Sequence, residues 1–163
     1  MQQLLNEVRT LFGSGPVPGA EALVDWDGFD LLDKETAVRF FAGKSWEAVL
    51  EHDRGHGPCE LEAWSVLRAP LLSYYGRAHL EYLFETTASD SPDDGFVSQL
   101  FHQLYQQVHR HKKSPFTAAQ TSVLVRIALQ LPVQSTAQGM DCLTDDFVVS
   151  QIQGYLQALD PRL

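Results

Sequence analysis

Apolar residues recur at intervals of three and four along most of this chain, and no segment alternates between apolar and polar residues as a half-buried strand does. The clearest example is the segment 96–111, where the apolar residues form one unbroken stripe along a helix. These residues are Phe96, Val97, Leu100, Phe101, Leu104, Tyr105 and Val108. The spacing predicts an all-α protein in which about six to seven helices pack into one bundle-like domain spanning residues 1–163.

Capping and helix-breaking residues predict where several helices begin and end. The first helix, residues 2–12, ends at the glycine- and proline-rich residues 13–19. We expect the second helix to begin with Asp33 as its N-cap and to end before Gly43, a glycine suited to the left-handed residue after a helix. The third helix begins after Ser45, a second N-cap residue.

Further boundaries follow from glycine and proline. Gly55 and Gly57 predict that the third helix ends before His56. Pro70 is typical of the first turn of a helix, and residues 86–95 are typical of a polar loop.

The C-terminal part of the chain predicts two more helices. Thr117 and Gln120 form the capping-box pattern Thr-x-x-Gln, which opens a helix that Pro132 ends. A polar linker, residues 134–140, then leads to a last helix over residues 145–159.

Several features predict a cytoplasmic protein without a membrane span. No segment approaches 18 consecutive apolar residues, and Asn6, Glu7 and Arg9 interrupt the apolar run that a signal peptide needs. Cys59 and Cys142 have no metal-type spacing, so we expect two unpaired thiols. The chain contains neither a Gly-x-Ser-x-Gly nor a phosphate-loop pattern, which favours a protein that is not an enzyme and holds no cofactor.

The charge is strongly negative and unevenly distributed. The chain has a formal net charge of −9, and residues 1–94 contain 17 acidic residues against 7 Lys and Arg. Residues 95–140 contain no acidic residue. Because nucleic-acid phosphates repel a net-negative protein, the charge predicts a basic protein partner rather than a nucleic acid.

The most distinctive local feature is the acidic stretch 21–33, which has no basic residue. Its acidic members are Glu21, Asp25, Asp27, Asp30 and Asp33. Trp26 lies between two aspartates, so we predict a partner-binding surface in which carboxylates steer encounter and the indole is the anchor. The alternative is a solvated loop in which Trp26 turns inward. The stretch does not match a calcium-binding loop, since Thr36 stands at the twelfth position from Asp25.

Two histidine-containing segments are weaker candidates. His52 and His56 have the i, i+4 spacing of helical zinc ligands, and Asp53 is a possible third ligand for a metal-dependent hydrolase, although a solvated helix end explains the same residues. The segment from His102 to Lys113 carries three histidines and two lysines at the end of a predicted helix. It is either a basic contact surface or a favourable arrangement with the helix dipole.

The segment 67–85 resembles a motif of a family of uncharacterised bacterial helical proteins. In that family a Leu-x-x-Pro start leads to Tyr-Tyr-Leu-Pro-Ala and an apolar helix. Tyr74 and Tyr75 match this motif, whereas Gly76 and Arg77 replace its Leu-Pro.

Two other segments resemble the same family in the same order. Residues 35–46 read E-x-x-x-x-F-F-x-G-K-x-W, and residues 116–120 resemble the family's capped helix opening. Proteins of this kind are often encoded beside bacterial toxins, so the resemblance implies an immunity protein that binds and neutralises a cognate toxin, such as a secreted nuclease. A helical adaptor that binds another protein is the remaining hypothesis.

Overall fold

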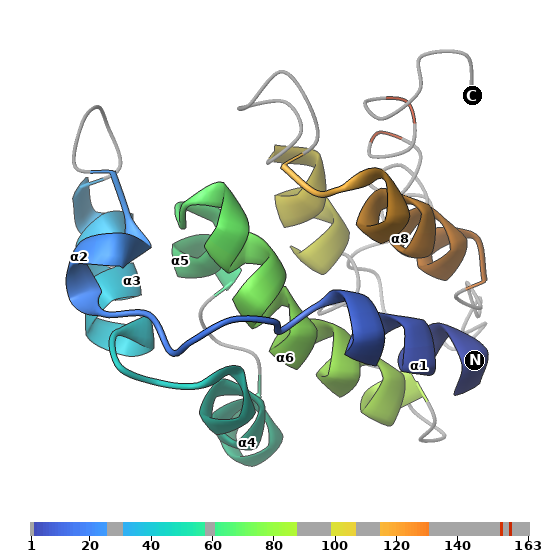
Figure 1. Ribbon diagram of the computed structural model, residues 1–163, viewed down its shortest axis with the longest axis horizontal. Coiled ribbons are helices and arrows are strands. Elements are labelled where there is room, and N and C mark those ends of the chain that lie inside the picture. The colour runs from blue at the N-terminus through green and yellow to red at the C-terminus, as the bar shows by residue number, and fades with distance from the viewer. Residues whose placement is uncertain are drawn as a thin grey trace, which may run out of the picture.

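The computed structural model describes residues 2–25, 31–57, 61–87, 99–106 and 115–130, together with residues 154 and 157. Its helices are α1 (Gln2–Leu11), α2 (Ala20–Leu23), α3 (Leu31–Phe41), α4 (Trp46–His56), α5 (Leu61–Ser65), α6 (Ala69–Thr87) and α8 (Ala118–Gln130), and residues 99–106 are also helical (Figure 1). These ranges contain no strand, so the prediction of an all-α protein is confirmed. Within them, no helix combines the length and the apolar character that crossing a membrane requires.

The longest helix, α6, lies at the centre of the arrangement. It has 19 residues, and α1, α4 and α5 all contact it (Figure 1). A helix covered on most sides needs buried residues around most of its circumference, and α6 meets this need with side chains such as Leu72, Tyr75, Ala78 and Leu83. Its polar residues at buried positions must therefore find partners within the protein.

Large aromatic side chains fill the core between these helices. Trp64, Tyr75, Phe12 and Phe41 are each no more than 1% exposed. The hydroxyl of Tyr75 lies 2.8 Å from the backbone oxygen of Phe41 and 3.0 Å from that of Lys44, so it satisfies the carbonyl groups at the end of α3. Burial raises the pKa of Tyr75, and the hydroxyl stays protonated and able to donate.

The boundary predictions based on Gly43 and Ser45 are confirmed. Gly43 follows α3 with a φ of +69°, in the left-handed region that favours glycine, and its N–H donates to the oxygen of Pro18. Ser45 caps α4, because its hydroxyl accepts a hydrogen bond of 3.3 Å from the N–H of Ala48. Local chemistry therefore determines the turn between α3 and α4.

Two other boundary predictions are wrong. Helix α3 begins at Leu31, so Asp33 lies inside its first turn and is not the N-cap. An aspartate interacts favourably with the helix dipole at either position, which is why the pattern did not distinguish them. Helix α4 runs to His56 and contains Gly55, and it ends only at Gly57, whose φ is +78°.

The predicted capping box at the start of α8 is confirmed, and its glutamine also makes contacts outside this helix. Thr117 and Gln120 exchange hydrogen bonds between each backbone N–H and the other side chain, at 2.9 and 3.3 Å. The amide nitrogen of Gln120 also donates to the oxygen of Leu11 at 2.8 Å and to the hydroxyl of Ser73. One side chain thus joins the start of α8 to the end of α1 and to α6.

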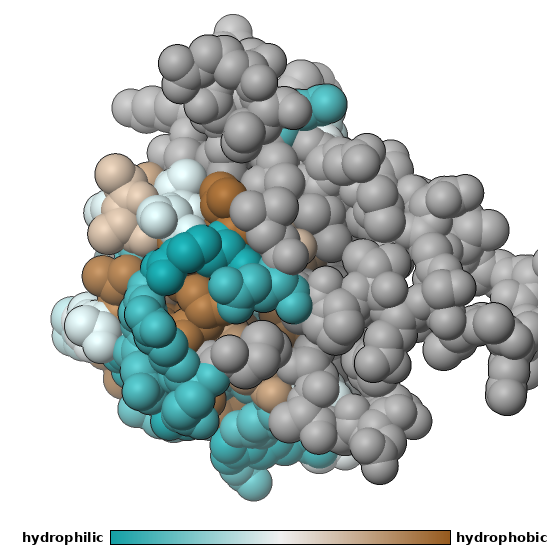
Figure 2. All heavy atoms as spheres, turned by 90° about the vertical axis from the view of Figure 1, so that its right-hand side faces the viewer, coloured by the Kyte–Doolittle hydropathy of each residue, from teal (hydrophilic) through white to brown (hydrophobic). Residues whose placement is uncertain are grey.

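Helices α1 and α8 also meet through an ion pair. Arg126 donates to Glu7 through both terminal nitrogens, one of them at 3.1 Å, and this contact holds the pKa of Glu7 below its usual value. Figure 2 shows this end of the molecule, where the described side chains are mainly hydrophilic around a small apolar area.

Other predictions fall partly or wholly outside the described residues. Pro70 lies in the first turn of α6 as predicted, but α6 continues through Thr87, so the predicted loop does not begin at residue 86. The rest of that loop, Pro132, the linker 134–140, Cys59, Cys142 and most of the predicted helices 96–111 and 145–159 lie outside the described residues.

Candidate protein-binding surface

Residues 21–25 and 31–33 form the described part of the acidic stretch, and we call them the acidic end. Leu23 and Val24 anchor it, since both are completely buried. Glu21 and Asp25 on either side of this anchor are exposed. Helix α2 contacts α3, and both lie at the left of Figure 1, away from α1 and α8. The acidic end therefore combines a fixed backbone with carboxylates in solvent.

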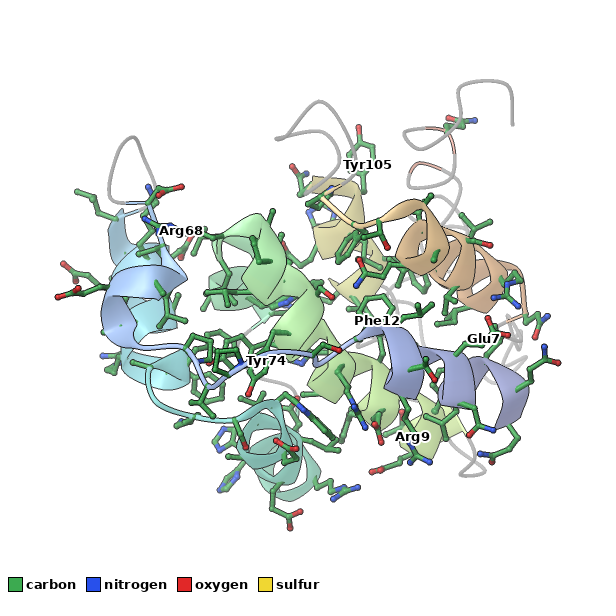
Figure 3. All side chains as sticks on the ribbon, viewed as in Figure 1. Glu7, Arg9, Phe12, Arg68, Tyr74 and Tyr105 are labelled. Atoms are coloured by element: carbon green, nitrogen blue, oxygen red, sulfur yellow. The ribbon has the colours of Figure 1, made fainter. Side chains whose placement is uncertain are left out.

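Asp25 makes an ion pair with the residue that precedes α6. Its Oδ1 accepts from Nε of Arg68 at 2.8 Å and lies 2.6 Å from the second nitrogen, and the Asp25 side chain remains 73% exposed. The backbone N–H of Arg68 donates to the oxygen of Leu23 at 2.9 Å. Figure 3 shows Arg68 beside α2 and α3. An exposed pair of this kind adds little stability.

Two leucines at the acidic end were not predicted as part of the surface. Leu31 is 56% exposed and Leu32 is 75% exposed, whereas the neighbouring Asp33 is half-buried. Sequence reasoning missed both because it placed the start of the helix at Asp33. The signal was the pair of leucines itself, directly after an aspartate-rich segment.

The six residues predicted to bind a partner are only partly described. Glu21 and Asp25 are exposed and Asp33 is half-buried, on neighbouring helices. Trp26, Asp27 and Asp30 lie outside the described residues, so the role of Trp26 as an anchor stays a prediction.

The alternative interpretation of His52, Asp53 and His56 as a metal site is not supported by their positions in the described residues. The rings of His52 and His56 stack at 4.6 Å between centroids, because α4 continues to His56. Asp53 instead points into the protein, where it is 1% exposed and contacts His79. Across the described ranges, no three His, Cys, Asp or Glu side chains are placed to hold one metal ion.

Asp53 and His79 form a buried polar pair between α4 and α6. Nδ1 of His79 lies 3.0 Å from Oδ2 of Asp53, and the two side chains are 0% and 1% exposed. The ring of His79 also meets Trp64 edge-on at 5.5 Å. Oδ1 of Asp53 and Nε2 of His79 have no hydrogen-bond partner among the described residues. This pair cannot act on a substrate, since neither group reaches solvent.

A second carboxylate on α6, Glu81, is buried between two arginines. Its Oε2 accepts from Arg9 at 3.0 and 3.2 Å and its Oε1 from Arg77 at 2.9 Å, and the Glu81 side chain is 5% exposed. Burial by itself raises the pKa of Glu81, but the hydrogen bonds from the two arginines outweigh it and leave the pKa below its usual value. We call these two groups, the Asp53–His79 pair and Glu81 with its two arginines, together the buried ionic centre, although Arg9 keeps 45% of its side chain exposed.

The arginine on α6 also touches the loop that follows α1. The guanidinium of Arg77 stacks 3.8 Å from the centre of the Trp46 ring, and it donates to the oxygen of Arg9 at 3.1 Å. Gly13 lies against this stack with a φ of +78°, and a Cβ there would lie 2.4 Å from Cδ of Arg77. These contacts fix Arg77 as part of the fold.

The described residues show only part of the other predicted surface, and a small internal space. His102 is half-buried in the helical residues 99–106, and the segment from His109 to Lys113 lies outside the described residues. One small apolar cavity of about 10 Å³ lies within the core, which is no larger than one water molecule needs. Its lining residues are Phe12, Trp64, Gly76, Leu80, Leu100, Leu104, Phe116 and Leu124.

Comparison with known proteins gives no assignment. No protein-family model, no curated protein and no solved structure matches this chain. The resemblance to the bacterial family with the Tyr-Tyr-Leu-Pro-Ala motif therefore stays a prediction.

Proposed function

We propose that this chain is an immunity protein that binds and neutralises a basic bacterial toxin through its acidic end. The observation that carries the proposal is the exposure of Glu21 and Asp25 around the buried anchor of Leu23 and Val24. Carboxylates held on a fixed backbone attract a basic partner before contact and raise the association rate.

The overall charge supports the same kind of partner. A net charge of −9 repels nucleic acid and favours a protein surface rich in Lys and Arg. A nuclease toxin has such a surface where it holds phosphates, so an acidic inhibitor that covers it blocks the substrate directly.

Co-expression with the adjoining gene tests the proposal. We expect that gene to encode a toxin that kills cells when expressed alone, and that this chain restores growth. The variant E21K/D25K should slow association with the purified, inactivated toxin by about tenfold or more at low salt. The variant E47K/E51K is the matched control, because it makes the same charge change at two exposed positions of α4.

Three results would contradict the proposal. Failure to restore growth against the adjoining toxin would exclude an immunity function for that toxin. Neighbouring genes without any toxin, together with a different captured partner, would favour the helical adaptor. Equal slowing by both charge variants would show that only net charge matters and that the acidic end is not the contact surface.

A further inference from the structure

The described residues expose three large apolar side chains, and two of them are consecutive. Val17 is 48% exposed, Leu31 is 56% exposed and Leu32 is 75% exposed. Single exposed apolar residues are ordinary on a protein surface. Two adjacent leucines in the first turn of α3, within the acidic end, form a small apolar patch.

Helix geometry shows that Leu32 has no role in the core of α3. Successive residues of a helix are rotated by about 100°. Leu32 is therefore turned by more than about 130° from Ala37 and Phe41, the buried residues that face the core. Its exposure follows from its position on the outer face of α3 and not from fraying at the start of the helix.

The charges around the two leucines indicate what can cover them. Glu21, Asp25 and Glu35 are exposed on the same two neighbouring helices or directly beside them, and Asp33 is half-buried. The nearest exposed cation of α3 is Arg39, two turns from Leu32. A second copy of the chain would bring like charges together, whereas a partner with Lys and Arg around an apolar recess is complementary.

We infer that Leu31 and Leu32 form the apolar centre of the partner-binding surface, and that the partner presents an apolar recess bordered by basic side chains. This inference rests on the proposed function and adds the contact that holds the complex together. Carboxylates mainly set the association rate, while desolvated apolar side chains at the centre of an interface mainly set the dissociation rate. Because the leucines stand on a formed helix, binding need not order them first.

Dissociation kinetics with the purified, inactivated product of the adjoining gene test the inference. The variant L31S/L32S should raise the dissociation rate by about tenfold or more and change the association rate little. The variant V17S is the control, since Val17 is also exposed but lies outside the acidic end. A photo-crosslinker at position 32 should attach to the partner, and both variants should unfold in urea as the wild type does.

Three other outcomes would contradict the leucine surface, the proposed function or the kind of partner. If L31S/L32S and the wild type dissociate at the same rate, the leucine surface is wrong while the proposed function stands. If the wild type does not bind this probe, the proposed function fails as well. If the wild type self-associates and L31S/L32S does not, the occupant is a second copy and the inference of a basic partner is wrong.

Discussion

Carboxylates occur in two contrasting regions of this protein. In the buried ionic centre, Asp53 and Glu81 are almost completely covered, and each has a partner on another helix, His79 for Asp53 and Arg9 for Glu81. At the acidic end, the side chain of Asp25 keeps 73% of its surface in solvent even though it pairs with Arg68. The same chemical group is therefore expected to have different consequences. In the centre its removal changes the free energy of unfolding, and at the acidic end, under the proposed function, it changes how a partner approaches.

The largest effect is expected at the Asp53–His79 pair. The variant His79→Ala leaves the Asp53 carboxylate buried without its partner, so we expect a loss of about 3 to 5 kcal/mol in the free energy of unfolding. Urea denaturation at pH 7, followed by circular dichroism, measures it. The double variant D53L/H79L is the control and should recover most of the loss, because no charge then stays unpaired. A loss below about 1 kcal/mol would show that the pair behaves like an exposed one.

The stabilisation of the fold by Glu81 depends on pH. Its pKa is lowered in the folded protein, so the ionised form stabilises the fold above the usual value of 4.5, and this stabilisation is lost as the pH falls through the lowered pKa. At pH 7 we expect Glu81→Gln to cost about 2 to 3 kcal/mol.

As the pH falls from 7 to 3, the free energy of unfolding of Glu81→Gln should approach that of the wild type. Unfolding curves over this pH range measure it. The variant Glu85→Gln is the control, since Glu85 lies one turn further along α6 in an exposed pair with Arg54. If the difference in free energy of unfolding between wild type and Glu81→Gln stays constant down to pH 3, the prediction of an ionised Glu81 is wrong.

Gly13 tests how rigidly the buried ionic centre is packed. The variant Gly13→Ala places a Cβ against Arg77 and Trp46 at a φ of +78°, so we expect a loss of about 1 to 2 kcal/mol from the backbone conformation alone. Gly19→Ala is the control, because nothing lies within 4 Å of its added Cβ and its φ is −79°. Thermal unfolding compares the two, and equal melting temperatures would show that the loop can move away from Arg77.

The smallest effect is expected at the acidic end. Asp25→Asn removes one charge of an exposed ion pair, and we expect the free energy of unfolding to change by less than about 0.5 kcal/mol. Urea denaturation measures this change, and the result is compared with that for His79→Ala. A loss of more than about 1 kcal/mol would remove the distinction between the two regions.

The elements of the fold that local chemistry determines could be predicted from the sequence. Ser45 as a cap, Gly43 as a left-handed residue and the Thr117–Gln120 capping box each act within four residues, and the structure confirms all three. The start of α3 and the end of α4 were predicted wrongly, because an aspartate and a glycine are each compatible with two positions at a helix end.

The contacts of the buried ionic centre that join different helices could not be predicted, since their partners are distant in sequence. Asp53 and His79 are 26 residues apart, and Arg9 and Glu81 are 72 apart. A histidine and a glutamate inside the apolar sequence of α6 do signal buried polar groups that need partners. Which residues supply those partners depends on how α1 and α4 pack against α6, and no local pattern encodes that. The described part of the acidic end was predicted as a surface from its charge, but its leucines were not.

The side chain of Gln120 has a consequence for the order in which the protein is made. It joins α8 to Leu11, and Arg126 joins α8 to Glu7, so α1 meets this partner only after more than 100 further residues have been made. At about 5 to 20 residues per second, a ribosome needs roughly 5 to 25 seconds to make the intervening chain. During that interval the face of α1 that α8 will cover is open to chaperones or to other nascent chains. Slow synthesis lengthens this interval, so a chaperone within reach of residues 2–12 would protect this face most when the chain is made slowly.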